Sequence, residues 1–103
     1  MFRISACYGR PSATDAFHDH YDNVHTPLVL RIPGLARLTT GMCQPLAPDQ
    51  DPPYYMVAGL IFESVEDLET ALNSPEMAAA SADVRNFATG GMTAFRTEEI
   101  NRS

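Results

Sequence analysis

The segment YYMVAGLIFE, residues 54–63, places the strongest constraint on the architecture of this chain. Side chains alternate between the two faces of an extended strand. One face of the segment carries Tyr54, Met56, Ala58, Leu60 and Phe62, and the other carries Tyr55, Val57, Gly59 and Ile61. Both faces are apolar, which is typical of a strand that is covered on both sides.

Three further segments predict the other strands of the sheet. Apolar and polar residues alternate over residues 2–9, and similar patterns predict strands over 35–44 and 92–99. The run 45–53 contains four prolines and two aspartates, so it is expected to be a loop.

Helical segments are expected between the predicted strands. The first has cap candidates at Ser12–Asp15 and ends at Pro33-Gly34, which cannot continue a helix. The others begin at Ser64 and at Ser74-Pro75, because serine is a favourable N-cap and proline fits the first helical position. The resulting order β-α-β-β-α-β predicts a ferredoxin-like α+β fold, with a four-stranded antiparallel sheet and helices on one face.

One helical layer leaves the second apolar face of residues 54–63 uncovered. The chain has 103 residues, the size of one domain, and we expect residues 1–103 to form that domain. A second copy of the sheet is the simplest cover, so the pattern predicts a homodimer in which two sheets pack face to face as a dimeric α/β barrel. Alternatively, the small residues Ser5, Cys7 and Gly59 leave a patch that tolerates solvent.

Charge and composition argue against several partners. Thirteen acidic side chains and seven arginines give a formal charge of −6, and no basic stripe is available for nucleic-acid phosphates. No window reaches the roughly 18 apolar residues of a membrane span, and the N-terminus does not resemble a signal peptide. We therefore expect no nucleic acid or membrane partner and a cytoplasmic location. Cys7 and Cys43 lie in separate predicted strands and are expected to be unpaired.

The segment FHDHYDNVHTPLVLRIPGL, residues 17–35, concentrates all three histidines of the chain. Phe17, Tyr21, Val24 and Leu28 form an apolar stripe at helical spacing. On a straight helix His18 and His25 share a face, while His20 points away from His18. The three histidines therefore cannot converge, and no metal site is expected.

Pro27 is expected to interrupt this helix. It lacks the N–H that would bond the carbonyl of Asn23, and Thr26 with Pro27 indicates an N-cap followed by a restart. His25 would then precede a helix N-terminus, whose partial positive charge keeps an imidazole neutral. Tyr21 lies four residues earlier on nearly the same face. This pair can perform acid–base chemistry, or His25 can merely satisfy a free carbonyl at the kink.

Several motifs along the chain resemble those of the EthD family. These proteins carry an aromatic residue, a His-Tyr or Tyr-Tyr pair, and then His-x-Pro-Leu followed by Pro-Gly. The matching residues are Phe17, His20-Tyr21, His25, Pro27-Leu28, Pro33-Gly34, VAGLIFES at 57–64, Ser74-Pro75-Glu76, Ala82-Asp83-Val84 and Asn86-Phe87.

The resemblance implies a dimeric α+β barrel and chemistry on small hydrophobic molecules. The family is named after a component of fuel-ether degradation and is broadly associated with oxidoreductases. Related members act as dehydratases, decarboxylases, isomerases or cofactor-independent oxygenases on aromatic polyketides and lactones. The family's motif positions correspond here to His20, Tyr21, His25, Pro27, Asp83, Asn86 and Phe87.

We therefore expect a cofactor-free enzyme acting on a small aromatic or lactone-like molecule. His25 is the expected acid/base, with Tyr21 and His20 as further catalytic residues. The expected substrate-binding residues are Tyr8, Met42, Met56, Leu60, Phe87 and Met92. No flavin, nicotinamide or phosphate-binding motif is present. Two alternatives remain: a non-catalytic binding or accessory protein for a partner oxygenase, and haem binding through a histidine, which a visible absorption band would reveal.

Overall fold

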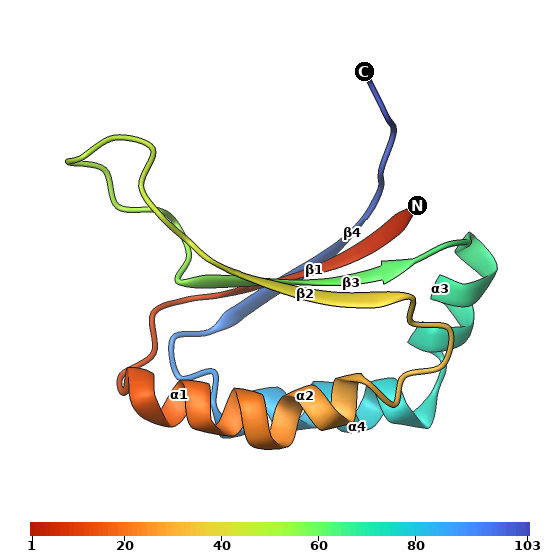
Figure 1. Cartoon of the computed structure of the whole chain (residues 1–103). Coiled ribbons are helices and arrows are strands. Elements are labelled where there is room, and N and C mark those ends of the chain that lie inside the picture. Colours follow the sequence, from red (N-terminus) through yellow and green to blue (C-terminus); the bar gives the residue numbers. More distant parts are fainter.

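The computed structural model describes residues 1–103 and contains one antiparallel sheet of four strands. The strands run in the spatial order β2-β3-β1-β4 (Figure 1). Their bounds are β1 (Phe2–Tyr8), β2 (Arg37–Met42), β3 (Met56–Phe62) and β4 (Met92–Glu98). This order is that of the ferredoxin-like fold, and the predicted fold class is confirmed.

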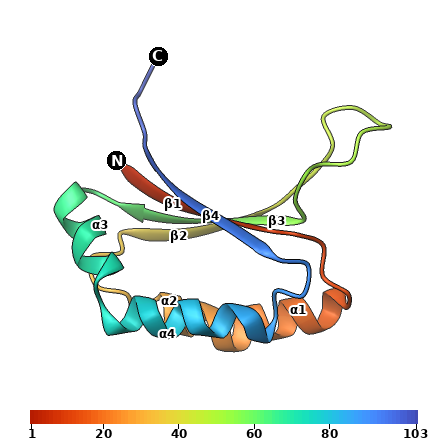
Figure 2. The same cartoon turned by 180° about the vertical axis from the view of Figure 1, so that it is seen from behind.

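The helices form a single layer beneath the sheet (Figure 1). The bounds are α1 (Thr14–His20), η1 (Tyr21–His25), α2 (Thr26–Val29), α3 (Val65–Leu72), α4 (Pro75–Asp83) and η2 (Val84–Asn86). Both views show that the α1–α2 rod and α4 run side by side under the strands, while α3 lies at one end of the sheet (Figure 2). None of these helices has the length and apolar content that crossing a bilayer requires.

Two of the predicted helix starts are confirmed in detail. The hydroxyl of Ser64 accepts a hydrogen bond from the backbone N–H of Asp67, and that of Ser74 accepts one from Met77. Each serine therefore satisfies a backbone donor that the first turn leaves free.

The predicted break at Pro27 is wrong, because the helix passes through it without interruption. Thr26 has helical dihedrals, φ −55° and ψ −47°, so it is not an N-cap. Residues Tyr21–His25 instead form a π-helical turn, in which the N–H of Thr26 donates to the carbonyl of Tyr21 five residues earlier. This wider turn changes the hydrogen-bond spacing just before the proline, where a regular α-helix would be disrupted.

The core lies between the helices and the lower face of the sheet. One cluster contains Ala6, Tyr8, Phe17, Tyr21, Met56, Ala58 and Phe87. A second contains Val29, Ile32, Leu60, Phe62, Leu68, Ala71 and Ala80. The alternate residues of β3 that were predicted to share one face, from Met56 to Phe62, are therefore the helix-facing ones.

The opposite face of the sheet carries no helix. Strand alternation places Val57, Gly59 and Ile61 of β3 on this open face, with Ser5 and Cys7 of β1 beside them. Phe95 of β4 pairs with Ser5 and is 50% exposed. Cys7 and Cys43 are both free thiols, in agreement with the prediction, because β3 separates β1 from β2.

Gly9 has no room for a side chain. The chain leaving β1 crosses the turn before β4 here, and a Cβ on Gly9 would overlap the backbone carbonyl oxygen of Gly90. Because that oxygen belongs to the backbone and cannot swing aside, we expect Gly9→Ala to lower the free energy of unfolding by about 1–3 kcal/mol.

Urea denaturation measures this effect, with Gly41→Ala as the matched control. A Cβ on Gly41, in β2, meets no atom within 4 Å, so the control should unfold at an unchanged or slightly higher urea concentration. Equal destabilisation by the two substitutions would contradict the steric explanation.

Candidate functional site

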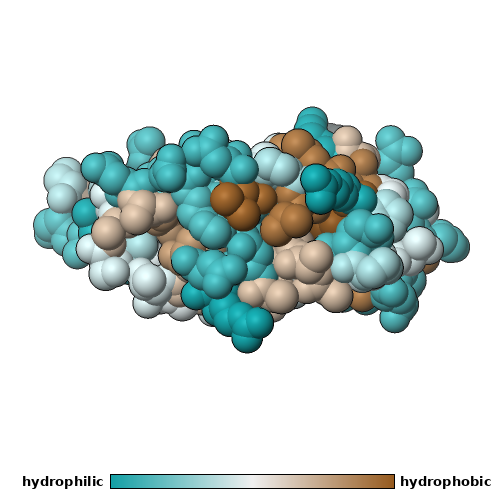
Figure 3. All heavy atoms as spheres, turned by 90° about the horizontal axis from the view of Figure 1, so that it is seen from below, coloured by the Kyte–Doolittle hydropathy of each residue, from teal (hydrophilic) through white to brown (hydrophobic).

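A largely apolar cavity of about 310 Å³ lies between the helices and the sheet. Sixteen residues line it, fourteen of them hydrophobic: Ile4, Ala6, Tyr8, Tyr21, His25, Val29, Ile32, Ala58, Leu60, Leu72, Met77, Ala80, Ser81, Val84, Met92 and Ala94. None of the lining residues carries a permanent charge. Seen from the helical side, the outer surface is mostly hydrophilic, with one group of hydrophobic residues near its middle (Figure 3).

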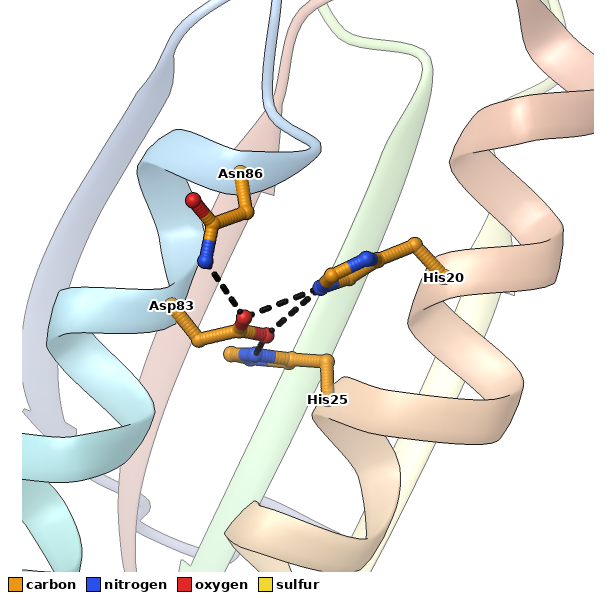
Figure 4. A network of polar contacts seen from close by, with 4 residues as sticks. All are labelled: His20, His25, Asp83 and Asn86. Atoms are coloured by element: carbon orange, nitrogen blue, oxygen red, sulfur yellow. Dashed lines mark hydrogen bonds and ion pairs between the residues drawn. The ribbon is translucent and has the colours of Figure 1, made fainter.

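The main titratable side chain in this lining is His25, which the π-helical turn positions. His25 is only 4% exposed. Its Nδ1 lies 3.0 Å from Oδ2 of Asp83, which comes from the end of α4 (Figure 4). A carboxylate only accepts hydrogen bonds, so Nδ1 carries the proton and Nε2 is left with a free lone pair.

Asp83 is the centre of a larger polar network. Nε2 of His20 lies 2.9 Å from Oδ1 and 3.0 Å from Oδ2 of this carboxylate. The side-chain amide of Asn86 donates to Oδ1 at 2.9 Å. Figure 4 shows the side chains of His20, His25 and Asn86 directed at Asp83. The two histidines come from the α1–η1 rod, and Asn86 comes from η2, directly after α4. With Asp83 only 7% exposed, these bonds compensate for the burial of its charge.

The π-helical turn explains how His20 and His25 reach the same carboxylate. Residues five apart on a regular α-helix point about 140° away from each other. The wider turn between them brings both onto the face that meets α4. His18 and His25 would share a face only on a straight helix; here Nε2 of His18 lies 2.7 Å from the hydroxyl of Tyr55, away from Asp83.

The electrostatics keep His25 neutral, although not for the predicted reason. The helical rod continues through His25 into α2, so no free helix N-terminus follows this residue. Instead burial lowers the pKa of His25, and the hydrogen bond and charge of Asp83 oppose this only in part. For Asp83, burial works to raise the pKa, but hydrogen bonds from Asn86, His20 and His25 together lower it. The resting pair is therefore a neutral imidazole beside an ionised carboxylate.

Two tyrosines place hydroxyl groups at the same cavity. Burial raises the pKa of Tyr21 to about 12 and also raises that of Tyr8. Neither hydroxyl bonds to another residue, and no fully shielded side-chain nitrogen or oxygen lacks a partner. The hydroxyls of Tyr8 and Tyr21 and Nε2 of His25 must therefore reach accessible space, and the cavity is the space that all three residues line. The site combines a proton acceptor with two hydroxyl donors.

The structure brings only some of the predicted site residues to this cavity. His25, Tyr21, Tyr8, Leu60 and Met92 line it.

The other predicted site residues lie outside the lining. His20 is linked to the cavity only through Asp83. Phe87 lies behind the lining, with its ring 4.7 Å from that of His25. Met56 is buried in the core, and Met42 borders a separate groove beside the proline-rich loop.

Asp83 is the functional residue that residue chemistry alone missed. The sequence marks it only as a family motif position, although its spacing from Asn86 fits a side-chain contact on a helix. Its bond to His25 spans 58 residues, a separation that no local pattern reveals. Ser81 and Val84, from the same helical segment, also line the cavity without having been predicted.

The lowered pKa of His25 predicts a pH dependence of stability. The ordinary pKa of histidine is 6.5. Below this pH the unfolded chain binds a proton at residue 25, whereas the folded protein does not. The free energy of unfolding should therefore fall as pH drops from about 7.5 to about 5.5. Asp83 does not contribute in this window, because its lowered pKa acts only near and below its ordinary value of 3.8.

Urea denaturation at the two pH values checks this expectation. His25→Gln should flatten the pH dependence, because glutamine cannot titrate there, whereas His18→Gln should preserve the contribution of His25. An unaltered pH dependence in His25→Gln would show that His25 binds its proton equally well in both states.

Known proteins resemble this chain in both sequence and structure. The EthD domain family matches residues 10–91, which include the whole Asp83 network. An uncharacterized 11.0 kDa protein from the thcB–thcC intergenic region of Rhodococcus erythropolis is 43% identical over 100 residues, covering 96% of this chain and 95% of that protein. The crystal structure of an EthD family protein from Bacillus halodurans C-125 matches with a TM-score of 0.87 and 29% identity, covering 97% of this chain and 99% of that chain.

Two more distant crystal structures share the fold alone. A dimeric ferredoxin-like protein from Thermobifida fusca YX matches with a TM-score of 0.66 and 16% identity, covering 93% of this chain and 88% of that chain. SnoaB from Streptomyces nogalater, a cofactor-independent oxygenase, matches with a TM-score of 0.63 and 14% identity, covering 98% of this chain and 93% of that chain. Since the family match spans most of the sequence and the most similar of these structures extends over nearly all of it, this chain belongs to the EthD domain family.

Proposed function

We propose that the protein is a cofactor-independent enzyme that moves a proton on a small, neutral, hydrophobic carbonyl compound, such as an aromatic ketone or a lactone. The observation that carries this proposal is the free Nε2 lone pair of His25 at an apolar cavity, with Nδ1 held by Asp83 at 3.0 Å. A histidine oriented in this way is a general base.

The base step follows from the protonation state of His25. Nε2 accepts a proton from the carbon next to the substrate carbonyl, and the electron pair of the broken C–H bond moves onto the carbonyl oxygen as an enolate. The resulting imidazolium is stabilised by the ionised carboxylate of Asp83. His25 then returns the proton, to the same carbon or to a leaving group, and regains its starting state.

Tyr8 and Tyr21 supply the complementary donors. Their raised pKa values keep both hydroxyls protonated at neutral pH. Because neither is engaged with the protein, each can donate a hydrogen bond to the substrate oxygen as negative charge develops on it. Abstraction of a proton next to a carbonyl requires this combination of a base and an oxygen stabiliser.

The lining also defines the charge of the substrate. It contains no arginine or lysine, so a carboxylate or phosphate would lose its hydration without gaining a cationic partner. A neutral compound with one polar edge suits this cavity. The description of SnoaB as a cofactor-independent oxygenase agrees with chemistry that needs no bound cofactor.

Deuterium exchange tests the proposal with a panel of compounds, so the natural substrate need not be identified first. The protein is incubated in heavy water with neutral aromatic ketones, cyclic ketones and lactones, and mass spectrometry follows incorporation next to the carbonyl. We expect at least one compound to exchange much faster with the protein than with His25→Gln. The His18→Gln variant should behave like the unaltered protein.

A different outcome would favour a binding or accessory role. If compounds bind the cavity by NMR shift mapping, but none exchanges faster than in buffer or than with His25→Gln, then His25 is not a base for these substrates. The cavity would then hold a molecule for a partner enzyme, for example an oxygenase.

We also propose that the protein is a homodimer formed through the open face of the sheet. This face presents Val57, Thr93 and the half-exposed Phe95 to solvent in the isolated chain. Pairing two such faces would bury this apolar surface, which stabilises association. The dimeric ferredoxin-like protein from Thermobifida fusca provides a precedent within the fold.

Sedimentation should give a mass twice the 11.3 kDa of one chain. We expect Phe95→Asp to shift this mass toward that of the monomer, because it places a charge in the apolar surface that pairing would bury. Leu46→Asp is the control, since Leu46 is fully exposed in the loop after β2. A monomeric mass for the unaltered protein would refute the dimer.

A further inference from the structure

The carboxylate of Asp83 contacts two histidines, and these two side chains differ in their exposure to solvent. His25 lies at the apolar cavity, with a side chain only 5% exposed, whereas the side chain of His20 is 26% exposed. Their nitrogens approach the same oxygen, Oδ2, each to 3.0 Å. Nδ1 of His20 has no protein partner and is not fully shielded, so it can exchange protons with solvent.

We propose that His20 is a positioning residue that controls the proton occupancy of His25: the network of His20, Asp83 and His25 readily accepts one proton, and His20 takes it first. The inference deepens the proposed function, since it concerns the basicity of the residue assigned there as acid/base.

Counting charges explains why a second proton is disfavoured. With both imidazoles neutral the network has a net charge of −1, and one added proton brings it to zero. A second proton would place two cations against one carboxylate oxygen, and that carboxylate is itself only 7% exposed, so water screens their repulsion weakly. The network therefore binds protons anticooperatively.

The unequal exposure decides which histidine is protonated first. A cation on His25 would be surrounded by the apolar cavity lining, whereas a cation on His20, whose side chain is 26% exposed, retains contact with water. Asp83 and His20 are the only groups whose charge shifts the pKa of His25 appreciably, and Tyr8 and Tyr21 beside it are neutral. Asn86, the remaining partner of Asp83, does not titrate.

A functional consequence follows for the proposed reaction. When His20 is protonated, its charge already compensates Asp83, so His25 is a weaker base. When His20 loses that proton, the full charge of Asp83 becomes available to stabilise the imidazolium on His25. Proton abstraction should therefore accelerate as pH rises through the titration of His20.

NMR titration of the histidine rings tests this inference without a substrate. In the unaltered protein, His20 should become protonated while His25 is still neutral. In His20→Gln, whose amide can still donate to Asp83 but cannot be charged, the titration of His25 should move upward by about one pH unit or more. His18→Gln should leave it in place, because His18 bonds Tyr55 and not Asp83.

The inference is overturned if His25 titrates at the same pH in the unaltered protein and in His20→Gln. It is also overturned, in the unaltered protein alone, if His25 takes up its proton before His20. Neither result depends on turnover. Coupled titration of the two histidines without deuterium exchange would refute the proposed function and leave this coupling intact. Deuterium exchange without coupled titration would refute the coupling and leave the proposed function intact.

Discussion

Substitution of His25 by glutamine is expected to slow proton abstraction by about 10²–10⁴-fold, the usual contribution of a positioned general base. Glutamine can still donate a hydrogen bond to Asp83, so the fold and the cavity should persist. It offers no basic nitrogen at the cavity, so the proton of the substrate has no acceptor. The effect should appear in the rate constant for exchange with saturating substrate.

The matched control for this experiment is His18→Gln. It makes the same chemical change at a histidine on the same helical rod, one that bonds Tyr55 rather than Asp83. Its exchange rate should equal that of the unaltered protein, and both variants should give similar thermal midpoints. If His25→Gln exchanges at the full rate but is clearly less stable, His25 has a structural role only.

Asp83→Ala is expected to lower both stability and turnover. Asp83 joins the helical rod of residues 14–29 to α4, and its removal leaves the buried Nδ1–H of His25 without an acceptor. A buried donor left in this way costs about 1–3 kcal/mol, and each kcal/mol lowers the thermal midpoint of a domain of this size by about 4–8 °C. Turnover should fall as well, because His25 can then rotate or carry its proton on Nε2.

Calorimetry or thermal melting followed by circular dichroism measures this loss. Asn86→Ala serves as the control, because it removes one of the hydrogen bonds to Asp83 from an exposed position and leaves both histidine contacts in place. It should be clearly milder than Asp83→Ala. Equal midpoints for Asp83→Ala and the unaltered protein would mean that the carboxylate stabilises neither helix nor histidine.

The sequence predicts the fold well because the relevant signals are local. The two-faced strand around Met56 and the serine caps at Ser64 and Ser74 each depend on residues within a few positions of one another. Their order along the chain then restricts the topology to very few alternatives. The sheet order observed here is the one that this reasoning predicts.

The site is less accessible to sequence reasoning because it depends on one irregular turn and one distant contact. The helical period of 3.6 residues correctly places Tyr21 beside His25, but applied through Tyr21–His25 it directs His20 and His25 to different faces. The signal of Pro27 indicates a break, although widening of the preceding turn also accommodates a proline. Asp83 then meets the histidines only after the whole chain has folded.

The π-helical turn has a consequence for how this site arises by mutation. Its i→i+5 spacing holds one residue more than a regular turn, so the five-residue step from His20 to His25 occupies the place of a four-residue step on an α-helix. Deleting a single codon within this turn would therefore leave the two histidines four residues apart. On a regular α-helix they would still share a face. A related gene that lacked this codon would show a one-residue gap here, and it could still encode both histidine partners of Asp83.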